Sequence, residues 1–295
     1  MTALEVVDAG LLTTIQDAGR PGLAHMGVPR SGAADAASYA QANAVVGNPP
    51  GCAVLETTLT GCVLRARHRM VLAVTGAICP VFVEDFPAPH GRAFHVDAGQ
   101  QVRVGAARHG ARSYVAVRGG VEGPAELGSR ATCMLTGLGP APLVAGDVLA
   151  VGAHPGEVSG LATASVSADS GTDLAAVAAS GEHVISVRLG PRHDFFTPEA
   201  LTTLQEASYV ASPESNRVGL RLEGAPLERR EQASLPSEGM VVGAVQVPPA
   251  GQPIVFLADH PVTGGYPVIA VATAQGVSWA AQVPPGATVR FVVEA

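Results

Sequence analysis

The sequence predicts a mainly β protein built from two small domains of the barrel or sandwich type, with a few short helices. Gly 35 and Pro 23 make up about a fifth of the 295 residues and are spread along the chain, as short strands joined by tight turns require. Apolar residues alternate with a period of two in many short, β-branched segments. The two halves also share one order, a helix near the start followed by strands, which favours a duplicated architecture.

In the first half, a pair of strands is expected between Leu4 and Ile15, on either side of Ala9-Gly10. A run of helix formers predicts a helix over 33–46, with Asp35 near its start and Gly47 after its end. The other strands of this half are bounded by Gly, Pro or Asp. They are expected at Ala53–Leu59, Cys62–Leu64, Met70–Thr75, Val81–Glu84, Gln101–Val104, Ser113–Arg118 and Asp147–Val151.

Residues 1–155 are therefore predicted to form an N-terminal domain, and 183–295 a C-terminal one. The stretch 156–182 is rich in Ala, Ser and Gly without an aromatic residue, which is typical of a linker. In the second half, Thr197 and Pro198 predict the start of a helix. A β-rich region from His183 carries further strands, expected at Ser208–Ser212, Gly219–Leu222, Val241–Val247, Ile254–Ala258, Ile269–Thr273 and Thr288–Val293.

Charge and composition exclude several classes of function. A net charge of −7 without a basic stripe argues against nucleic acid as a partner. All 18 basic residues are arginine, so this chain can supply neither a Schiff-base lysine nor the lysine of a phosphate-binding loop or of attached biotin. Four well-separated cysteines indicate buried thiols of a reducing compartment. Without an apolar run of membrane-spanning length or a signal-peptide pattern, we expect a cytoplasmic protein with no membrane contact.

Standard catalytic motifs are missing from the sequence. It contains no G-x-S-x-G, H-E-x-x-H or strand-borne G-x-G-x-x-G pattern. The nine histidines are dispersed, and no pair has the spacing of a metal site on one element, so no metal is expected.

Polar residues instead gather in three clusters. The first, Thr13–Arg20, is either a turn that bonds its own backbone or part of a site. The second runs from Gly27 to Asn48, where Asp35, Ser38 or Tyr39, and Asn43 share one helix face, either a solvent face or a face that meets a substrate.

The third polar cluster is Asp259–Pro267, preceded by Gly243–Pro248. A strand delivers Asp259 into a loop where Gly264 and Gly265 permit close approach of a ligand. The alternative is a glycine-rich hairpin in which Asp259 forms a turn. The convergence of Asp, Thr and Tyr in one short loop favours a functional site.

The sequence motifs of these clusters, taken together and in order, resemble those of the biotin-dependent carboxyltransferase or allophanate hydrolase subunit 2 family. That family includes the KipA-type proteins assigned as the C subunit of bacterial 5-oxoprolinase. The matching phrases cover nearly the whole chain outside the linker. They are Thr13–Arg20, Gly27–Asp35, Ala42–Asn48, Leu55–Thr58, Thr75–Ala77, Arg112–Gly120, Leu127–Arg130, Ser215–Gly224, Gly243–Pro248 and Thr263–Pro267.

The resemblance implies a pair of cyclophilin-like β-barrel domains, in agreement with the two β-rich halves. It implies a heteromer with a smaller, KipI-like B subunit and a lactam-utilisation-type A subunit, which together cleave 5-oxo-L-proline to L-glutamate with ATP. Because the chain lacks lysine, ATP is expected on a partner chain and no cofactor on this one. Its share is then substrate binding and activation, for a small amide or lactam.

Within the matching motifs, Arg20 and Arg217 suit a carboxylate or amide substrate. Asp35, Asn43 and Gln246 are expected to orient amide groups, and Glu56 or Asp259 to take a proton. The catalytic set is therefore Asp35, Glu56 and Asp259; the substrate-binding set is Gln16, Arg20, Asn43, Arg217, Gln246, Thr263, Gly264, Gly265 and Tyr266.

Two other functions stay open at this stage. The chain could be the carboxyltransferase component of a urea carboxylase or allophanate system, and only that function would need biotin, on a separate carrier. It could also be a KipA-type regulator that binds a kinase-inhibitor protein.

Overall fold

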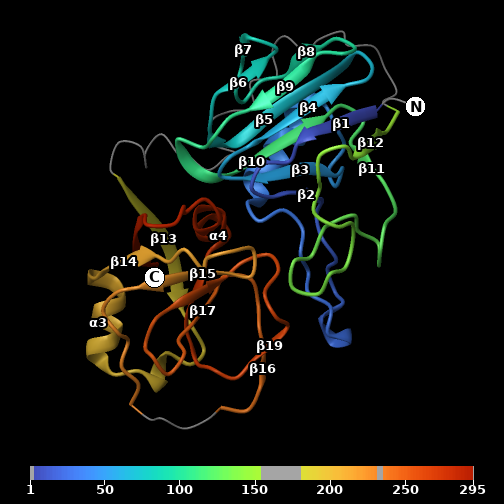
Figure 1. Cartoon of the computed structure of the whole chain (residues 1–295). Helices are drawn as coiled ribbons and strands as arrows, with labels where there is room; N and C mark the ends of the chain where they lie inside the picture. The colour runs from blue at the N-terminus through green and yellow to red at the C-terminus, as the bar shows by residue number, and fades with distance from the viewer. Residues whose placement is uncertain (1–2, 154–180, 231–234, 295) are drawn as a thin grey trace.

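The computed structural model describes residues 3–153, 181–230 and 235–294. The expected fold class, mainly β with a few short helices, is confirmed: within these ranges the α-helices are α1 (Ala36–Val46), α3 (Pro198–Glu206) and α4 (Ala274–Ala281). The two halves of the chain form separate groups of sheets, with β1 to β12 in one and β13 to β21 in the other (Figure 1). Most of the predicted linker, 156–182, lies outside the described residues.

The N-terminal half consists of two sheets that enclose one apolar core. The seven-stranded sheet has the order β11-β12-β1-β4-β9-β6-β7, and the five-stranded sheet β2-β3-β10-β5-β8. Leu64 and Val102 from the first meet Leu55, Val74 and Val115 from the second in this core. The strands are β1 (Ala3–Asp8), β2 (Thr13–Gln16), β3 (Val54–Thr58), β4 (Cys62–Ala66), β5 (Met70–Ile78), β6 (Val81–Val83), β7 (Phe86–Ala88), β8 (Phe94–Val96), β9 (Gln101–Val104), β10 (His109–Val117), β11 (Val121–Glu122) and β12 (Val148–Val151).

The expected pairing of the first two strands is wrong. Both β1 and β2 form, but β1 pairs with β4 and β12, whereas β2 pairs with β3. The turn at Gly10 therefore carries the chain from one sheet to the other instead of closing a hairpin. Gly10 has a φ of +61°, and a Cβ there would lie 1.9 Å from the carbonyl oxygen of Gly61, so the two glycine backbones pack directly together.

The outer face of the five-stranded sheet has an apolar end and a polar end. Side chains alternate along strands, so Val54 and Glu56 of β3 share this face with Arg112 and Tyr114 of β10. Helix α1 covers the apolar end, where it packs on Val54, Val71 and Tyr114. Asp35 caps this helix by accepting from the N–H groups of Ala37 and Ser38, and Gly47 ends it in the left-handed conformation, as the sequence predicts. The polar end of this face, with Glu56 and Arg112, contacts the C-terminal half.

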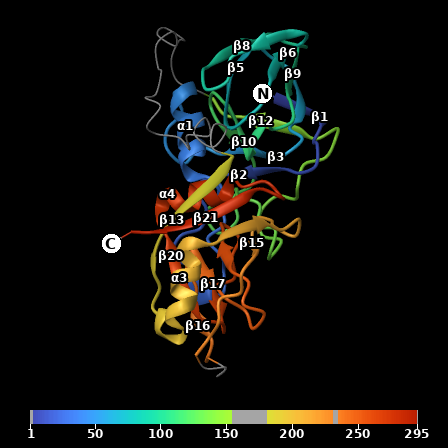
Figure 2. The ribbon, with the colours of Figure 1, turned by 90° about the vertical axis from the view of Figure 1, so that its left-hand side faces the viewer.

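The C-terminal half is a closed barrel of seven strands in the order β13-β20-β17-β18-β15-β14-β21. Its core contains Ile185, Leu220, Val255 and Phe291. Figure 2 shows α4 of this half directly below α1 of the first half, where the two halves meet. The strands are β13 (Glu182–Leu189), β14 (Ser208–Ala211), β15 (Gly219–Glu223), β16 (Glu238–Gly239), β17 (Ala244–Gln246), β18 (Ile254–Phe256), β19 (Thr263–Gly264), β20 (Val268–Ala272) and β21 (Thr288–Val293), with β16 and β19 paired outside the barrel.

Each strand expected from the sequence overlaps a strand of the structure, but α4 was not predicted. The N-cap of this helix is Thr273, whose hydroxyl accepts from the Gly276 N–H. A β-branched residue after an apolar run favours the end of a strand, and a glycine inside a short segment weakens any helical signal. The short strands β7, β8, β11, β16 and β19 were also missed, because two or three residues carry no measurable alternation.

We expect Gly61→Ala to destabilise the N-terminal half by about 3 kcal/mol or more. Gly61 has a φ of +76°, and a Cβ there would lie 2.0 Å from the carbonyl oxygen of Val104. Gly286→Ala is the matched control, since Gly286 has a φ of +80° with no atom within 4 Å of its Cβ position, and should cost only about 1 kcal/mol. Urea unfolding of both variants measures the difference, and equal losses would contradict the backbone contact.

Candidate functional site

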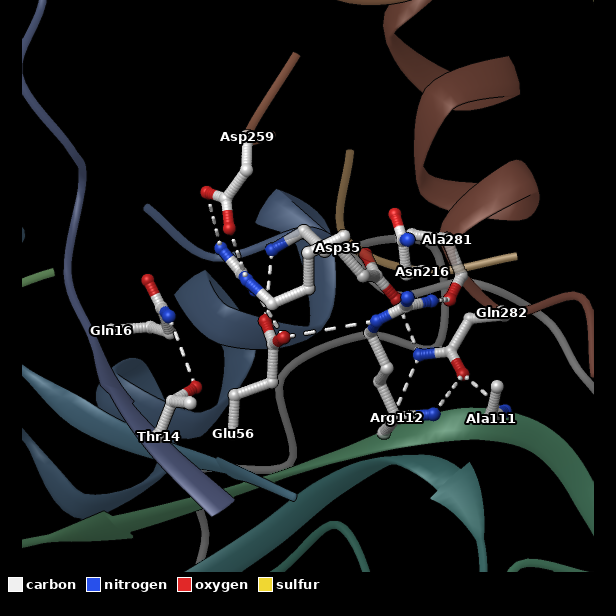
Figure 3. A network of polar contacts seen from close by, with 12 residues as sticks. Thr14, Gln16, Asp35, Glu56, Ala111, Arg112, Asn216, Asp259, Ala281 and Gln282 are labelled. Atoms are coloured by element: carbon white, nitrogen blue, oxygen red, sulfur yellow. Dashed lines mark hydrogen bonds and ion pairs between the residues drawn. The ribbon is translucent and has the colours of Figure 1, made fainter. Parts of the chain in front are cut away.

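The guanidinium of Arg217 joins the two halves at a fully buried ion cluster. Arg217 stands just before β15, and its Nε and Nη2 donate to Asp259 at 3.0 and 3.2 Å. Its Nη1 crosses to the N-terminal half and donates to Glu56, and its Nη2 donates to the Gly32 carbonyl. The side chains of Arg217, Glu56 and Asp259 are at most 1% exposed. This Arg217 centre therefore holds together groups that are far apart in the sequence, and Figure 3 labels its two carboxylates, Glu56 and Asp259.

Glu56 is the member of the centre that belongs to the five-stranded sheet. The strand register places Thr14, Glu56 and Tyr114 side by side on β2, β3 and β10. Besides Arg217, its carboxylate accepts from the Tyr114 hydroxyl and the Ala34 N–H, both at 2.9 Å. Arg112 Nε lies 3.7 Å from the same carboxylate. Glu56 thus has two cationic neighbours and two further donors.

Asp259 is held equally tightly from the other side. Its carboxylate accepts from Ser31 Oγ at 2.6 Å and from the Met134 N–H at 2.9 Å, in addition to Arg217. Its own N–H donates to the Arg217 carbonyl at 3.0 Å, so backbone and side chain fix the same pair. Apart from Arg217, the two donors to this carboxylate, Ser31 and Met134, belong to the N-terminal half.

Gln282, directly after α4, forms a second link between the halves. Its Oε1 accepts from the N–H groups of Ala111 and Arg112, at 2.9 and 3.0 Å. Its Nε2 donates to the Arg112 carbonyl and to Asp35, both at 2.9 Å. All four hydrogen-bonding positions of this buried amide are used. Gln282 therefore fixes Arg112 and the cap of α1 against the barrel (Figure 3).

The charges of this centre oppose proton transfer by Glu56. Burial works against ionisation, but Arg217 and then Arg112 outweigh it and hold the pKa of Glu56 below its ordinary value of 4.5. Burial and the neighbouring carboxylates of Glu56 and Asp35 raise the pKa of Tyr114 well above 10.0. A carboxylate held in its ionised form by two arginines binds and orients; it is a poor base while the pairs persist.

We expect the wild-type chain to lose stability on acidification more steeply than Glu56→Gln. The lowered pKa of native Glu56 means that its ionised form is favoured by folding, so its contribution is present above pH 4.5 and is lost as the pH falls through the native pKa. The variant is less stable at pH 7, but it lacks this titration. Urea unfolding between pH 7 and pH 3 measures both slopes, and parallel curves would contradict the assignment.

A cavity of about 490 Å³ opens beside the Arg217 centre, between the two halves. Arg112, Asn216 and Arg217 line it together with apolar side chains such as Leu59 and Met134. A second cavity of about 310 Å³ lies near the start of α1, lined mainly by alanines together with Asp17 and Tyr39. The first has the size and mixed lining of a small-molecule site.

The structure brings together four of the predicted site residues: Asp35, Glu56, Arg217 and Asp259. The catalytic set thus converges, although its carboxylates are already paired with donors. Asn43 lies elsewhere on α1, where it donates to the Cys52 carbonyl and accepts from Asn48 at 2.9 Å. The helix face that carries Asp35, Ser38 and Asn43 is buried and does not face solvent.

Gln16 and Arg20 are also buried, and their side chains donate hydrogen bonds to loop carbonyls. Gln16 donates to Thr14 Oγ1 and to the Thr132 carbonyl, both at 3.0 Å, and its own Oε1 has no partner among the described residues. Arg20 donates to the carbonyls of Glu126 and Ala131, at 3.0 and 2.7 Å. These contacts fix the segment 126–132.

The third predicted cluster is divided: Asp259 belongs to the Arg217 centre, and the other predicted residues form a separate group on the barrel. Gln246 donates to the Tyr266 carbonyl at 3.2 Å, and Thr263 and Gly264 pair with β16. The Tyr266 ring is partly exposed, with the Arg229 guanidinium 5.8 Å from its centre. In the ranges that the structure describes, none of Gln246, Thr263, Gly264, Gly265 and Tyr266 has a hydrogen bond to the Arg217 centre.

Arg112, Asn216 and Gln282 were missed as site residues. Arg112 and Tyr114 stand two apart on a strand, which is the one sequence signal that they share a face. Gln282 carries no such signal, since its partners are some 170 and 247 residues away. The described part of the chain holds no cluster of three potential metal ligands and no helix long and apolar enough to cross a membrane.

Solved structures show the class of protein to which this fold belongs. The chain superposes with a TM-score of 0.87 on the urea amidolyase of K. lactis, at 29% identity, over 99% of this chain and 19% of that one. It superposes on the protein TTHA0988 with a TM-score of 0.85 at 31% identity, again over 99% of this chain, but over only 55% of that chain. The class is a two-part β module that occurs within longer chains.

The sequence comparisons give the family. Residues 26–293 match the model of the carboxyltransferase domain, subdomain A and B, and the chain belongs to this family. It is 33% identical to the C subunit of 5-oxoprolinase from Escherichia coli, over 98% of this chain and 90% of that protein. It is 31% identical to the urea amidolyase of Lachancea kluyveri, over 98% of this chain and 17% of that protein. The predicted resemblance is confirmed.

Proposed function

We propose that the chain is the C subunit of an ATP-dependent 5-oxoprolinase, which cleaves 5-oxo-L-proline to L-glutamate. One observation carries the proposal: the chain matches the C subunit of the E. coli 5-oxoprolinase along 90% of that protein, whereas it matches only 17% of a urea amidolyase. The match thus extends along most of one 5-oxoprolinase polypeptide. The relative's name, which makes it one subunit of several, also supports a complex. The partners proposed are a KipI-like B subunit and a lactam-utilisation-type A subunit.

The role proposed for this chain is to bind and orient the substrate in the cavity beside the Arg217 centre. Arg112 and Asn216, which line this cavity, carry donors for carbonyl and carboxylate oxygens. The chain has no lysine and no glycine-rich phosphate loop, and ATP is proposed to bind a partner chain. Because there is no lysine, biotin cannot be attached to any of these 295 residues.

The test is reconstitution with both partners, followed by an assay of 5-oxoproline-dependent ATP hydrolysis. We expect activity in the complete complex and none when this chain is omitted. Activity that survives the omission would overturn the proposal.

A second candidate is the carboxyltransferase part of a urea carboxylase, favoured by the TM-score of 0.87 with the K. lactis urea amidolyase. This function requires a biotin carrier from another chain. Dependence of the activity on biotin and urea, with no response to 5-oxoproline, would favour it.

A further inference from the structure

The cavity between the halves has an unusual distribution of charge. Its walls are mostly apolar, with Leu59, Met134, Val218 and Val283 among them. The charged residues that line it are two arginines, Arg112 and Arg217, and no acidic residue among those described lines it. Glu56 and Asp259 lie behind Arg217, where they accept its hydrogen bonds. The surface that a ligand would meet is therefore apolar and cationic.

The two arginines differ in what they can still offer. Every nitrogen of the Arg217 guanidinium donates to a carboxylate or a carbonyl. Arg112 donates from Nη1 to the Ala281 carbonyl, and its buried Nε has no hydrogen bond although Glu56 is 3.7 Å away. Its Nη2 has no hydrogen-bond partner in the described part of the chain. Arg112 therefore has fewer acceptors around its guanidinium than Arg217, and its Nη2 can donate to a ligand.

Asn216, an exposed residue that lines the same cavity, supplies a second donor. Its Oδ1 accepts from the Val218 N–H at 2.8 Å, which fixes the orientation of the amide. The amide nitrogen has no hydrogen-bond partner among the residues described. Asn216 and Arg112, both labelled in Figure 3, line the same cavity.

We propose that this cavity is a carboxylate-binding site, in which Arg112 and Asn216 donate to the carboxylate and the apolar walls enclose a small ring or aliphatic body. Donors without acceptors select a ligand that presents oxygen acceptors. Two donors suit one carboxylate, whereas a phosphate group is usually met by several backbone N–H groups at a glycine-rich turn. The proposal deepens the proposed function and rests on it for the identity of the physiological ligand, since 5-oxoproline is a ring carboxylate.

Binding can be measured on the full chain without its partners. Isothermal titration calorimetry measures this binding directly and needs no reporter group. Three probes separate the contributions: 5-oxo-L-proline, 2-pyrrolidone, which keeps the lactam but lacks the carboxylate, and cyclopentanecarboxylate, which keeps the carboxylate but lacks the lactam. We expect saturable binding of a ring carboxylate, at least tenfold tighter than that of 2-pyrrolidone.

Asn216→Asp is the informative variant. It keeps the Oδ1 that accepts from Val218, so the loop is retained, but it replaces the free donor with a negative charge. We expect carboxylate binding to weaken at least tenfold. Arg112→Gln should do the same, and Arg221→Gln, which removes an exposed arginine outside the cavity, should leave the affinity unchanged.

The outcomes separate this proposal from the proposed function. Binding of cyclopentanecarboxylate that Asn216→Asp abolishes supports the carboxylate site even if the complex does not hydrolyse 5-oxoproline. Failure of both carboxylates to bind, equal binding of 2-pyrrolidone, or binding that is indifferent to Asn216→Asp and Arg112→Gln would overturn it.

Discussion

Replacing Arg217 with methionine is expected to destabilise the chain by about 3–5 kcal/mol or to prevent its folding. The substitution leaves the carboxylates of Glu56 and Asp259 buried without their shared cation, and a buried charge that has lost its partner costs about this much. A loss of this size is a large part of the roughly 5–15 kcal/mol by which typical domains are stable. Urea unfolding of the purified variant gives the value.

Two further variants control for this result. Arg221→Met removes an exposed arginine whose carboxylate partner, Glu214, is 4.0 Å away, and should change stability by less than about 1 kcal/mol. Combining Arg217→Met with Glu56→Gln and Asp259→Asn removes the unpaired charges and should recover part of the loss. If Arg217→Met is as stable as Arg221→Met, the Arg217 centre does not hold the halves together.

The second large effect is expected for Gln282→Leu. The substitution keeps the approximate size of the side chain but leaves the Ala111 N–H and the Arg112 N–H without their acceptor in a buried interface. Each unsatisfied buried group costs about 1–3 kcal/mol, and because the groups share one residue we expect about 3 kcal/mol or more in total. Gln275→Leu, at an exposed position of the same helix, is the matched control and should have little effect.

Amide hydrogen exchange distinguishes the loss of this link from general destabilisation. The amides of Ala111 and Arg112 donate to Gln282, so in Gln282→Leu they should exchange faster than neighbouring amides of β10 such as Val115. Uniform acceleration along β10, or no difference from Gln275→Leu, would contradict the role of Gln282.

Local signals account for what the sequence predicted well. Asp35 and Gly47 mark the ends of α1 because capping depends on residues a few positions apart. The period of two in β4 and β9 is equally local, so these strands and the mainly β class followed from the sequence. The pairing of β1 did not, since it depends on which distant strands, β4 and β12, complete the sheet.

The site was harder to predict because it is made by contacts between the halves. Glu56 and Arg217 were chosen from motifs. Their ion pair joins residues 161 apart, and no local sequence pattern predicts a contact over that separation. Polar residues on α1 suggested an exposed or substrate-facing surface. In the folded chain Asp35 and Asn43 instead satisfy buried backbone and side-chain groups. Gln282 could not be predicted as a site residue, because its helix was not predicted and its partners lie in the other half of the chain.

A crystal structure of the chain grown with 5-oxo-L-proline tests most directly whether the cavity beside the Arg217 centre binds a small carboxylate substrate. We predict the ligand in this cavity between the halves, with its carboxylate within hydrogen-bonding distance of Arg112 Nη2 and the Asn216 amide. Ligand bound instead at the Gln246–Tyr266 cluster, or in the alanine-lined cavity near the start of α1, would contradict this assignment.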